Sequence, residues 1–197
     1  MITGVTEAYF TQVNSANIGL AATFSVNPSS CENSSFYKEY LRFSALSDLR
    51  SGHTTTHLFI DETASRIMGF LSLRASSIIS QGEGSVMLGE PALEISMLAV
   101  DKEYERRGVG RTLIDFALSE AAELHNNHLG IRYIILAADP MAIPFYKKMG
   151  FVLLEDRWSH MPKENWSSRC DPMVLELNFE SEYLETFIDD GDEDDDF

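Results

Sequence analysis

A glycine-rich turn is the part of this sequence that most directly indicates chemistry. Residues 105–112 read ERRGVGRT and stand between an apolar segment and an amphipathic one. Gly108 and Gly110 let the main chain approach a ligand with no Cβ in the way, and N–H groups at the start of a new helix attract anions. Positive charge at the same place comes from Arg106, Arg107 and Arg111. We therefore expect this turn to bind a phosphate group, unless its glycines serve only to start the helix.

Two other phosphate-binding motifs fit these residues poorly. A Walker A loop needs a glycine and a lysine at the positions where Glu105 and Arg111 stand. A dinucleotide fingerprint needs a third glycine at Leu113, and its glycines should follow the strand directly. Seven residues separate Val100 from Gly108. We therefore set both motifs aside.

Two predicted elements hold this turn. Residues 92–100 (ALEISMLAV) are largely apolar and too few for a free-standing helix, so they predict a buried strand. Strict alternation along a strand separates its side chains into two faces. One face would carry Glu94, Ser96, Leu98 and Val100, and the other Ile95, Met97 and Ala99. After the turn, an apolar stripe predicts a helix over residues 109–125.

The remaining elements predict a mixed α/β domain, residues 1–179, with helices packed on a sheet. A helical spacing of aromatic residues marks 35–52, and Pro140 opens a short helix that ends at Gly150. Strands are expected at 57–61, 66–78, 132–138, 151–155 and 172–178. Because glycines are frequent between residues 80 and 91, we expect a loop or a short irregular ribbon there.

The net charge of −16 is concentrated at one end of the chain. Residues 180–197 contain ten acidic and no basic residues, which leaves 21 acidic and 15 basic residues elsewhere, a balance of −6. We expect this acidic tail to be disordered because its charges repel one another. The remaining balance disfavours nucleic acid as a partner, because nucleic-acid binders gather Lys and Arg on one face. It favours a cationic amine or a basic peptide.

Other kinds of site find little support in the sequence. His53 and His57 flank three threonines but lack a third ligand at a suitable spacing, so we expect no metal. The first residues show no basic segment followed by an apolar run, and no stretch approaches the roughly 18 apolar residues of a membrane span. We therefore expect a cytoplasmic protein that contacts no membrane, and we leave a homodimer open.

Two motifs together resemble the coenzyme-binding half of the GNAT N-acetyltransferase superfamily. In that family a strand ending in an L-A-V-like segment leads to a [Q/R]-x-x-G-x-[G/A] turn and a long helix. A second strand then leads to an N-x-x-A-x-x-[F/L]-Y-x-x-x-G-F helix. Here the motifs read ERRGVG at residues 105–110 and DPMAIPFYKKMGF at residues 139–151, and the match covers about 60 residues. Glu105 stands in place of the usual Gln or Arg, and Asp139 in place of the usual Asn.

The resemblance implies the GNAT fold, a mixed and mostly antiparallel central sheet flanked by helices. It also implies that an amine attacks bound acetyl-CoA directly, without a covalent enzyme intermediate. The coenzyme diphosphate would lie on Arg106, Arg107, Gly108, Val109, Gly110, Arg111 and Thr112. The rest of the coenzyme would contact Leu98, Ala99, Val100, Asp139 and Tyr146. Main-chain N–H groups of residues 97–100 would polarise the thioester carbonyl.

Three side chains are candidates for the proton transfers. Tyr146 matches the tyrosine that protonates or anchors the leaving sulfur in the family, although with Phe145 it would also suit a core pair. Glu94 is our candidate base, because a carboxylate in an apolar strand is costly unless it is used or paired. It also stands where some histone-acetylating members carry a catalytic glutamate, and its alternative is a salt bridge. Ser96 would carry a water relay.

The acceptor amine is not specified by these motifs. A small polyamine, an antibiotic-like amine and a protein amino terminus all remain open. The motifs also resemble the toxin-like branch of the superfamily, which acetylates the amino acid on charged tRNA, although the chain has few basic residues outside the turn. A protein that binds acetyl-CoA without catalysis is the alternative from another class.

Overall fold

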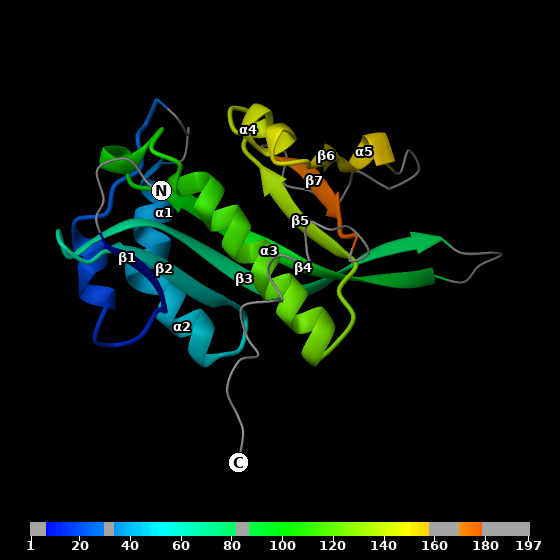
Figure 1. Cartoon of the computed structure of the whole chain (residues 1–197), viewed down its shortest axis with the longest axis horizontal. Helices are drawn as coiled ribbons and strands as arrows, with labels where there is room; N and C mark the ends of the chain where they lie inside the picture. Colours follow the sequence, from blue (N-terminus) through cyan, green and yellow to red (C-terminus); the bar gives the residue numbers. More distant parts are fainter. Residues whose placement is uncertain (1–6, 30–33, 82–86, 158–169, 179–197) are drawn as a thin grey trace, which may run out of the picture.

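A mixed sheet forms the centre of the molecule. The structure is a computed structural model that describes residues 7–29, 34–81, 87–157 and 170–178. Within these residues, a seven-stranded sheet has the order β1-β2-β3-β4-β5-β7-β6 (Figure 1). Its strands are β1 Ala8–Gln12, β2 Thr55–Asp61, β3 Arg66–Gln81, β4 Met87–Val100, β5 Tyr133–Ala138, β6 Val152–Leu153 and β7 Asp171–Glu176. Neighbouring strands are antiparallel except β4 and β5, which are parallel, so the expected fold class is confirmed.

Helices cover both faces of this sheet. On one face lies α3, Val109–Asn127, whose buried stripe includes Leu113, Ile114 and Ala117. On the other face lie the short 3-10 helix η1, Ile18–Ala22, and one helical run made of α1, Ser34–Glu39, η2, Tyr40–Ser44, and α2, Ala45–Arg50. The predicted helices at 35–52 and 109–125 are thus confirmed, with a wider π-type turn, η2, inside the first. The sheet lies between two apolar layers, and Figure 1 shows α3 crossing the front of the sheet.

Gly69 in β3 sets how closely α3 approaches the sheet. A Cβ on this residue would lie 3.0 Å from the carbonyl oxygen of Ala99 and 3.0 Å from the side chain of Leu113. Any larger residue would push the first turns of α3 away from β4. The absence of a side chain at Gly69 therefore allows the first turns of α3 to pack closely against β3 and β4.

The two faces of β4 differ from the expected alternation because the strand contains a bulge. Ser72 of β3 pairs with Met97, whereas the next residue, Leu73, pairs with Ile95, so Ser96 is an extra residue. One extra residue exchanges the faces for everything that follows it. Ile95 therefore shares the layer of α3 with Leu98, while Met97 belongs to the opposite layer. The predicted grouping of Glu94 with Leu98 and Val100 is wrong for this reason.

The region between residues 80 and 91 is more regular than expected. β3 continues to Gln81 and β4 already begins at Met87, and their ladder runs without a register shift from Leu73 and Ile95 to that end. Pro91 does not interrupt the ladder, because a proline is tolerated where its nitrogen faces no partner strand. Residues 82–86 lie outside the described part. The predicted loop is therefore wrong for residues 80–81 and 87–91, which extend a long hairpin.

The C-terminal strands are partly as predicted. β7 and β5 occupy the expected segments 172–178 and 132–138 to within two residues. The predicted strand 151–155 is shorter, because Leu154 begins the short helix α5, Leu154–Arg157, and is buried against β5 and β7. The helix that follows Pro140 is α4, Ile143–Lys148. The acidic tail, residues 180–197, lies outside the described residues.

Candidate active site

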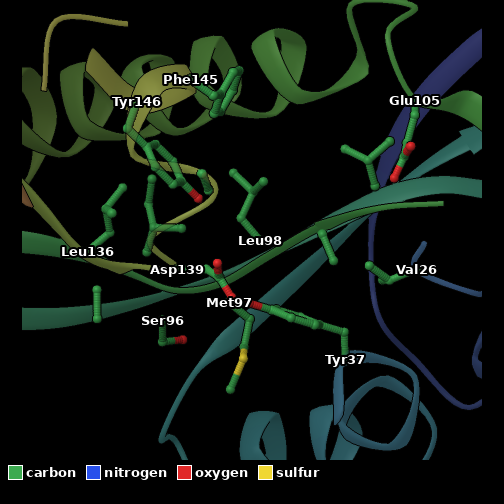
Figure 2. A pocket seen from close by; sticks show the side chains of 15 residues that line it. Val26, Tyr37, Ser96, Met97, Leu98, Glu105, Leu136, Asp139, Phe145 and Tyr146 are labelled. Carbon is green, nitrogen blue, oxygen red and sulfur yellow. The ribbon is translucent and has the colours of Figure 1, made fainter. Parts of the chain in front are cut away.

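The sheet forks between its two parallel strands. β4 and β5 pair only from Ala92 with Tyr133 to Ile95 with Leu136, although both strands continue beyond these pairs. The bulge at Ser96 comes directly after the last pair. A cleft opens between the diverging ends (Figure 2), and it is lined by Ser96, Leu98, Val100, Asp139, Phe145 and Tyr146 among others. The fork therefore brings together residues that the sequence analysis placed in both motifs.

The main chain of β4 presents hydrogen-bonding groups to this cleft. The N–H of Asp101 donates to the carbonyl of Met68 at 2.8 Å. Counting back along β4 from this pair, every second residue exchanges hydrogen bonds with β3. In this register Met97 and Ala99 direct their main-chain groups toward β3. Leu98 and Val100 consequently direct theirs toward the gap on the β5 side. An extended ligand with amide groups can pair with β4 as an added strand would.

The turn before α3 has the conformation of an anion site. Arg106 has a φ of 59° and Gly108 a φ of 93°, both in the left-handed region. This conformation turns consecutive N–H groups to one side, next to the positive end of the helix that begins at Val109. The side chains of Arg106, Arg107 and Arg111 are exposed around it. The residues present therefore fit a diphosphate.

A buried carboxylate holds this turn in place. Asp101 is fully buried and accepts hydrogen bonds from the N–H of Glu103 at 3.0 Å and of Ser25 at 2.9 Å. Arg66 lies 3.6 Å from the same carboxylate. The N–H of Lys102 donates in turn to the carbonyl of Ser25. The segment before α1 is thus fastened to the turn, and ligand binding needs little reordering there.

Two further contacts shape the region around the cleft. Glu105 lines the cleft, and its carboxylate accepts a hydrogen bond from the side-chain amide of Asn27 at 3.1 Å. Gly110 lies against Phe145, whose ring would be 3.3 Å from a Cβ at that position. The first turn of α3 is therefore in contact with the ring of Phe145 in α4. This contact places the two sequence motifs side by side in one wall of the cleft.

Tyr146 is a buried tyrosine that lines the cleft. Its side chain comes from α4, and only 7% of the residue is exposed. Burial raises the pKa of its hydroxyl strongly, and the nearby Tyr37, Asp139 and Cys170 raise it further. The hydroxyl therefore stays protonated at neutral pH and can give a proton to an anion that forms beside it.

The structure separates Glu94 from this cleft. Glu94 does not line it, and its carboxylate lies 2.6 Å from the guanidinium of Arg74, its direct partner across the strands. Ser96 does line the cleft, and its hydroxyl donates to the carbonyl of Ser72 at 3.2 Å. For Glu94 to act as a base, it would have to exchange Arg74 for the amine or act through a water near Ser96.

Tyr37 of α1 and Val26 also line the cleft. The aromatic spacing around Tyr37 favoured core packing, with the acceptor pocket that the family resemblance implies as the alternative, and Val26 carried no signal in the sequence. No group of three His, Cys, Asp or Glu side chains within the described ranges is arranged to hold a metal ion. None of the helices in the described part has the length and apolar character needed to cross a membrane.

Comparisons with known proteins agree with this geometry. Residues 24–161 match the family model of the acetyltransferase (GNAT) domain. Similar folds include a bacterial toxin, 22% identical over 96% of this chain and 99% of that one, with a TM-score of 0.66. AtaTR bound with AcCoA is 17% identical over 92% and 98% of the two chains, with a TM-score of 0.63. AtaT complexed with acetyl-methionyl-tRNAfMet is 15% identical over 86% and 95%, with a TM-score of 0.67.

At such identities the solved structures show a shared fold, whereas the family model spans well over half of the chain. The two motifs of the sequence and the forked sheet lie inside the matched residues. The glycine-rich turn at residues 105–112 suits the diphosphate of the coenzyme, and the main chain of β4 suits its amide-containing arm. The chain therefore belongs to the GNAT family and is an acetyl-CoA-dependent N-acetyltransferase.

Proposed function

We propose that this enzyme acetylates a primary amine by direct attack of the amine on acetyl-CoA, with both substrates bound together. The observation that carries the proposal is the fork between β4 and β5, which leaves the main-chain groups of Leu98 and Val100 directed into a cleft that Tyr146 also lines. A thioester held along β4 would place its carbonyl near these groups. Positioning of two reactants in this way supplies a large part of a rate enhancement.

The turn before α3, β4 and Tyr146 each have a defined role in this proposal. The turn at residues 106–112 binds the diphosphate, and the N–H of Leu98 polarises the thioester carbonyl. As the amine nitrogen forms its bond to the carbonyl carbon, the bond from carbon to sulfur breaks. The hydroxyl of Tyr146 gives its proton to the leaving sulfur. The base is a carboxylate: the sequence favours Glu94, through a water at Ser96, and its pairing with Arg74 outside the cleft makes Asp139, which lines the cleft, the alternative.

The test is the release of CoA thiol with a panel of primary amines. Wild-type protein should release thiol faster with at least one of spermidine, glycinamide and a lysine-containing peptide. Tyr146→Phe should lower kcat by about 100-fold or more while it leaves the affinity for CoA unchanged. Tyr9→Phe is the matched control, because Tyr9 is an exposed tyrosine of β1 that does not line the cleft.

Two outcomes would contradict the proposal. If CoA binds but no amine accelerates thiol release, the chain acts as a coenzyme-binding module. If Tyr146→Phe retains the full kcat, the proton for the leaving sulfur comes from another group. Calorimetry with CoA separates both outcomes from a misfolded preparation.

A second candidate acceptor is the amino acid carried by a charged tRNA. It is favoured by the similar fold of AtaT, which was solved with acetyl-methionyl-tRNAfMet. The acidic balance of this chain opposes it, because phosphate contacts need basic residues. A salt-sensitive gel shift with charged tRNA, together with acetylation of its amino acid, would support this acceptor. The absence of any shift at low salt would exclude it.

A further inference from the structure

The carboxylates around the fork have different surroundings. Of the described residues that line the cleft, two carry a carboxylate, Glu105 and Asp139. Glu105 lies beside the coenzyme turn and accepts a hydrogen bond from Asn27. Asp139 lies at the other side of the cleft, directly after the end of β5. Glu94 lies outside the cleft and is paired with Arg74. Of the two cleft carboxylates, Asp139 is therefore the one that lies away from the turn at residues 106–112.

Asp139 and Leu98 line the same cleft. The last parallel pair of the fork is Ile95 with Leu136, and both residues lie beyond it, Leu98 in β4 and Asp139 directly after the end of β5. A thioester held along β4 would therefore share the cleft with the Asp139 side chain.

Local hydrogen bonds fix the position of Asp139. Its Oδ1 accepts from the N–H of Met141 at 2.9 Å, and its own carbonyl accepts from the N–H of Ala142 at 2.8 Å. These bonds form the turn that leads into α4. The residue is half-buried, which strengthens its electrostatic interactions relative to a surface carboxylate.

Two tyrosines complete the surroundings of this carboxylate. Figure 2 shows the Tyr37 ring reaching across from α1 toward Asp139 and Met97, with the Tyr146 ring on the α4 side. Asp139 is close enough to Tyr146 that its charge helps to raise the pKa of that hydroxyl. A carboxylate between aromatic rings suits a cation, because the faces of aromatic rings also attract positive charge.

We propose that Asp139 binds the ammonium group of the acceptor and takes its proton during the transfer. This inference rests on the proposed function. The bound ammonium first gives one proton to Asp139, which frees the lone pair that forms the bond from nitrogen to the carbonyl carbon. The electron pair of the carbon–sulfur bond leaves with sulfur, which takes its proton from Tyr146. The new bond makes the remaining N–H groups acidic, so a second proton leaves the nitrogen and, through solvent, restores the hydroxyl of Tyr146. Asp139 then passes its own proton to solvent.

This role differs from the coenzyme contact that the family resemblance implies for position 139. An asparagine there offers an amide that can donate to the coenzyme, whereas a carboxylate can only accept hydrogen bonds when ionised. The exchange of Asn for Asp thus suits an acceptor that arrives as a cation better than it suits an anionic coenzyme.

The test measures binding without turnover. Protein saturated with CoA is titrated calorimetrically with glycinamide, spermidine and a lysine-containing peptide, and then with the neutral N-acetyl form of glycinamide. Asp139→Asn keeps an oxygen for the N–H of Met141 but removes the charge. It should weaken the binding of the cationic probes by about 10- to 100-fold, the range for a hydrogen bond to a charged group. It should leave the binding of N-acetylglycinamide unchanged, and it should not weaken the binding of CoA.

Two variants make this test specific. Asp171→Asn is the matched control, because Asp171 is an exposed carboxylate at the start of β7 that does not line the cleft. Glu94→Gln tests the rival carboxylate in the same titration. If Asp139→Asn and wild type bind the cations equally, if only Glu94→Gln weakens them, or if Asp139→Asn weakens CoA instead, the inference is wrong.

The failure of this inference differs from the failure of the proposed function. If no cationic probe binds to the wild-type complex with CoA, the inference fails while thiol release can still report on catalysis. If thiol release shows no acceptor at all but cations bind in an Asp139-dependent way, the proposed function fails and the cation site stands.

Discussion

The hydroxyl of Tyr104 donates a hydrogen bond of 2.9 Å to the carboxylate of Asp61. Both residues are buried, and the bond joins the turn before α3 to the end of β2. The other oxygen of Asp61 accepts from the N–H of Ala64 at 3.0 Å. The guanidinium of Arg107 lies 5.4 Å from the centre of the Tyr104 ring. The conformation of the turn at residues 105–112 therefore depends on the hydrogen bond between Tyr104 and Asp61, which lies outside it.

Replacing Tyr104 by phenylalanine should weaken the coenzyme site. The change leaves a buried carboxylate without one donor, at a cost of about 1–3 kcal/mol in the free energy of unfolding. The loosened turn should raise the KM for acetyl-CoA by about 3- to 10-fold, since binding must then reorder it. The KM for S-acetylpantetheine, which lacks the diphosphate, should not change. Equal increases for both thioesters would show that Tyr104 acts on the whole cleft rather than on the turn.

The buried hydroxyl of Tyr146 predicts a dependence of stability on alkaline pH. Burial raises its pKa in the folded protein above the value of about 10 found in unfolded chains. The folded state therefore holds this proton more tightly, so its stabilising effect is complete below pH 10 and is lost as the pH rises above that value. Urea unfolding between pH 9 and pH 11 should show a smaller loss of stability for Tyr146→Phe than for wild type. Parallel curves for the two proteins would contradict this assignment.

His57 predicts the opposite dependence at acidic pH. It lies in β2 against the ring of Phe116, and burial lowers its pKa below the usual value. Because the folded state favours the neutral ring, its stabilising effect is complete above about pH 6.5 and is lost as the pH falls through the lowered pKa. His57→Phe should reduce the loss of stability between pH 7 and pH 5, measured as the midpoint of urea unfolding. His53→Gln, a change at an exposed histidine, serves as the control.

Gly69 predicts a steric effect on stability. An alanine there would press on the carbonyl of Ala99 and on Leu113, so Gly69→Ala should destabilise the fold by about 1–3 kcal/mol. Gly130→Ala is the matched control, because a Cβ there meets nothing within 4 Å. It should change the free energy of unfolding by less than about 0.5 kcal/mol. Similar losses for both variants would argue against the close approach of α3.

The order of elements and the position of the glycine-rich turn before α3 were predictable from local signals. The apolar run at 92–100, the glycines at 108 and 110, and the stripe of α3 each lie within a short stretch of sequence. Their physical causes, burial and the geometry of a helix start, operate over the same range. The second motif likewise predicted the position of Tyr146, which lines the cleft.

Features that depend on distant partners were not predictable in the same way. The bulge at Ser96 is visible only once β3 is paired with β4, and it reverses the faces that alternation assigned. The partner of Glu94 is Arg74, twenty residues away on another strand. The presence of Asp139 and Leu98 in one cleft requires the pairing of β4 with β5. Each of these relations is set by strand pairing, which no single segment encodes.

The orientation of Leu98 and Val100 has a consequence for how such an enzyme can diversify. The backbone is chemically the same in every residue, so a substitution along the end of β4 keeps the grip on the coenzyme as long as the strand persists. In the proposed function, side chains elsewhere in the cleft, such as those of Tyr37 and Asp139, would recognise the second substrate. Single substitutions of these side chains would therefore change which acceptor is preferred while the binding of acetyl-CoA is kept.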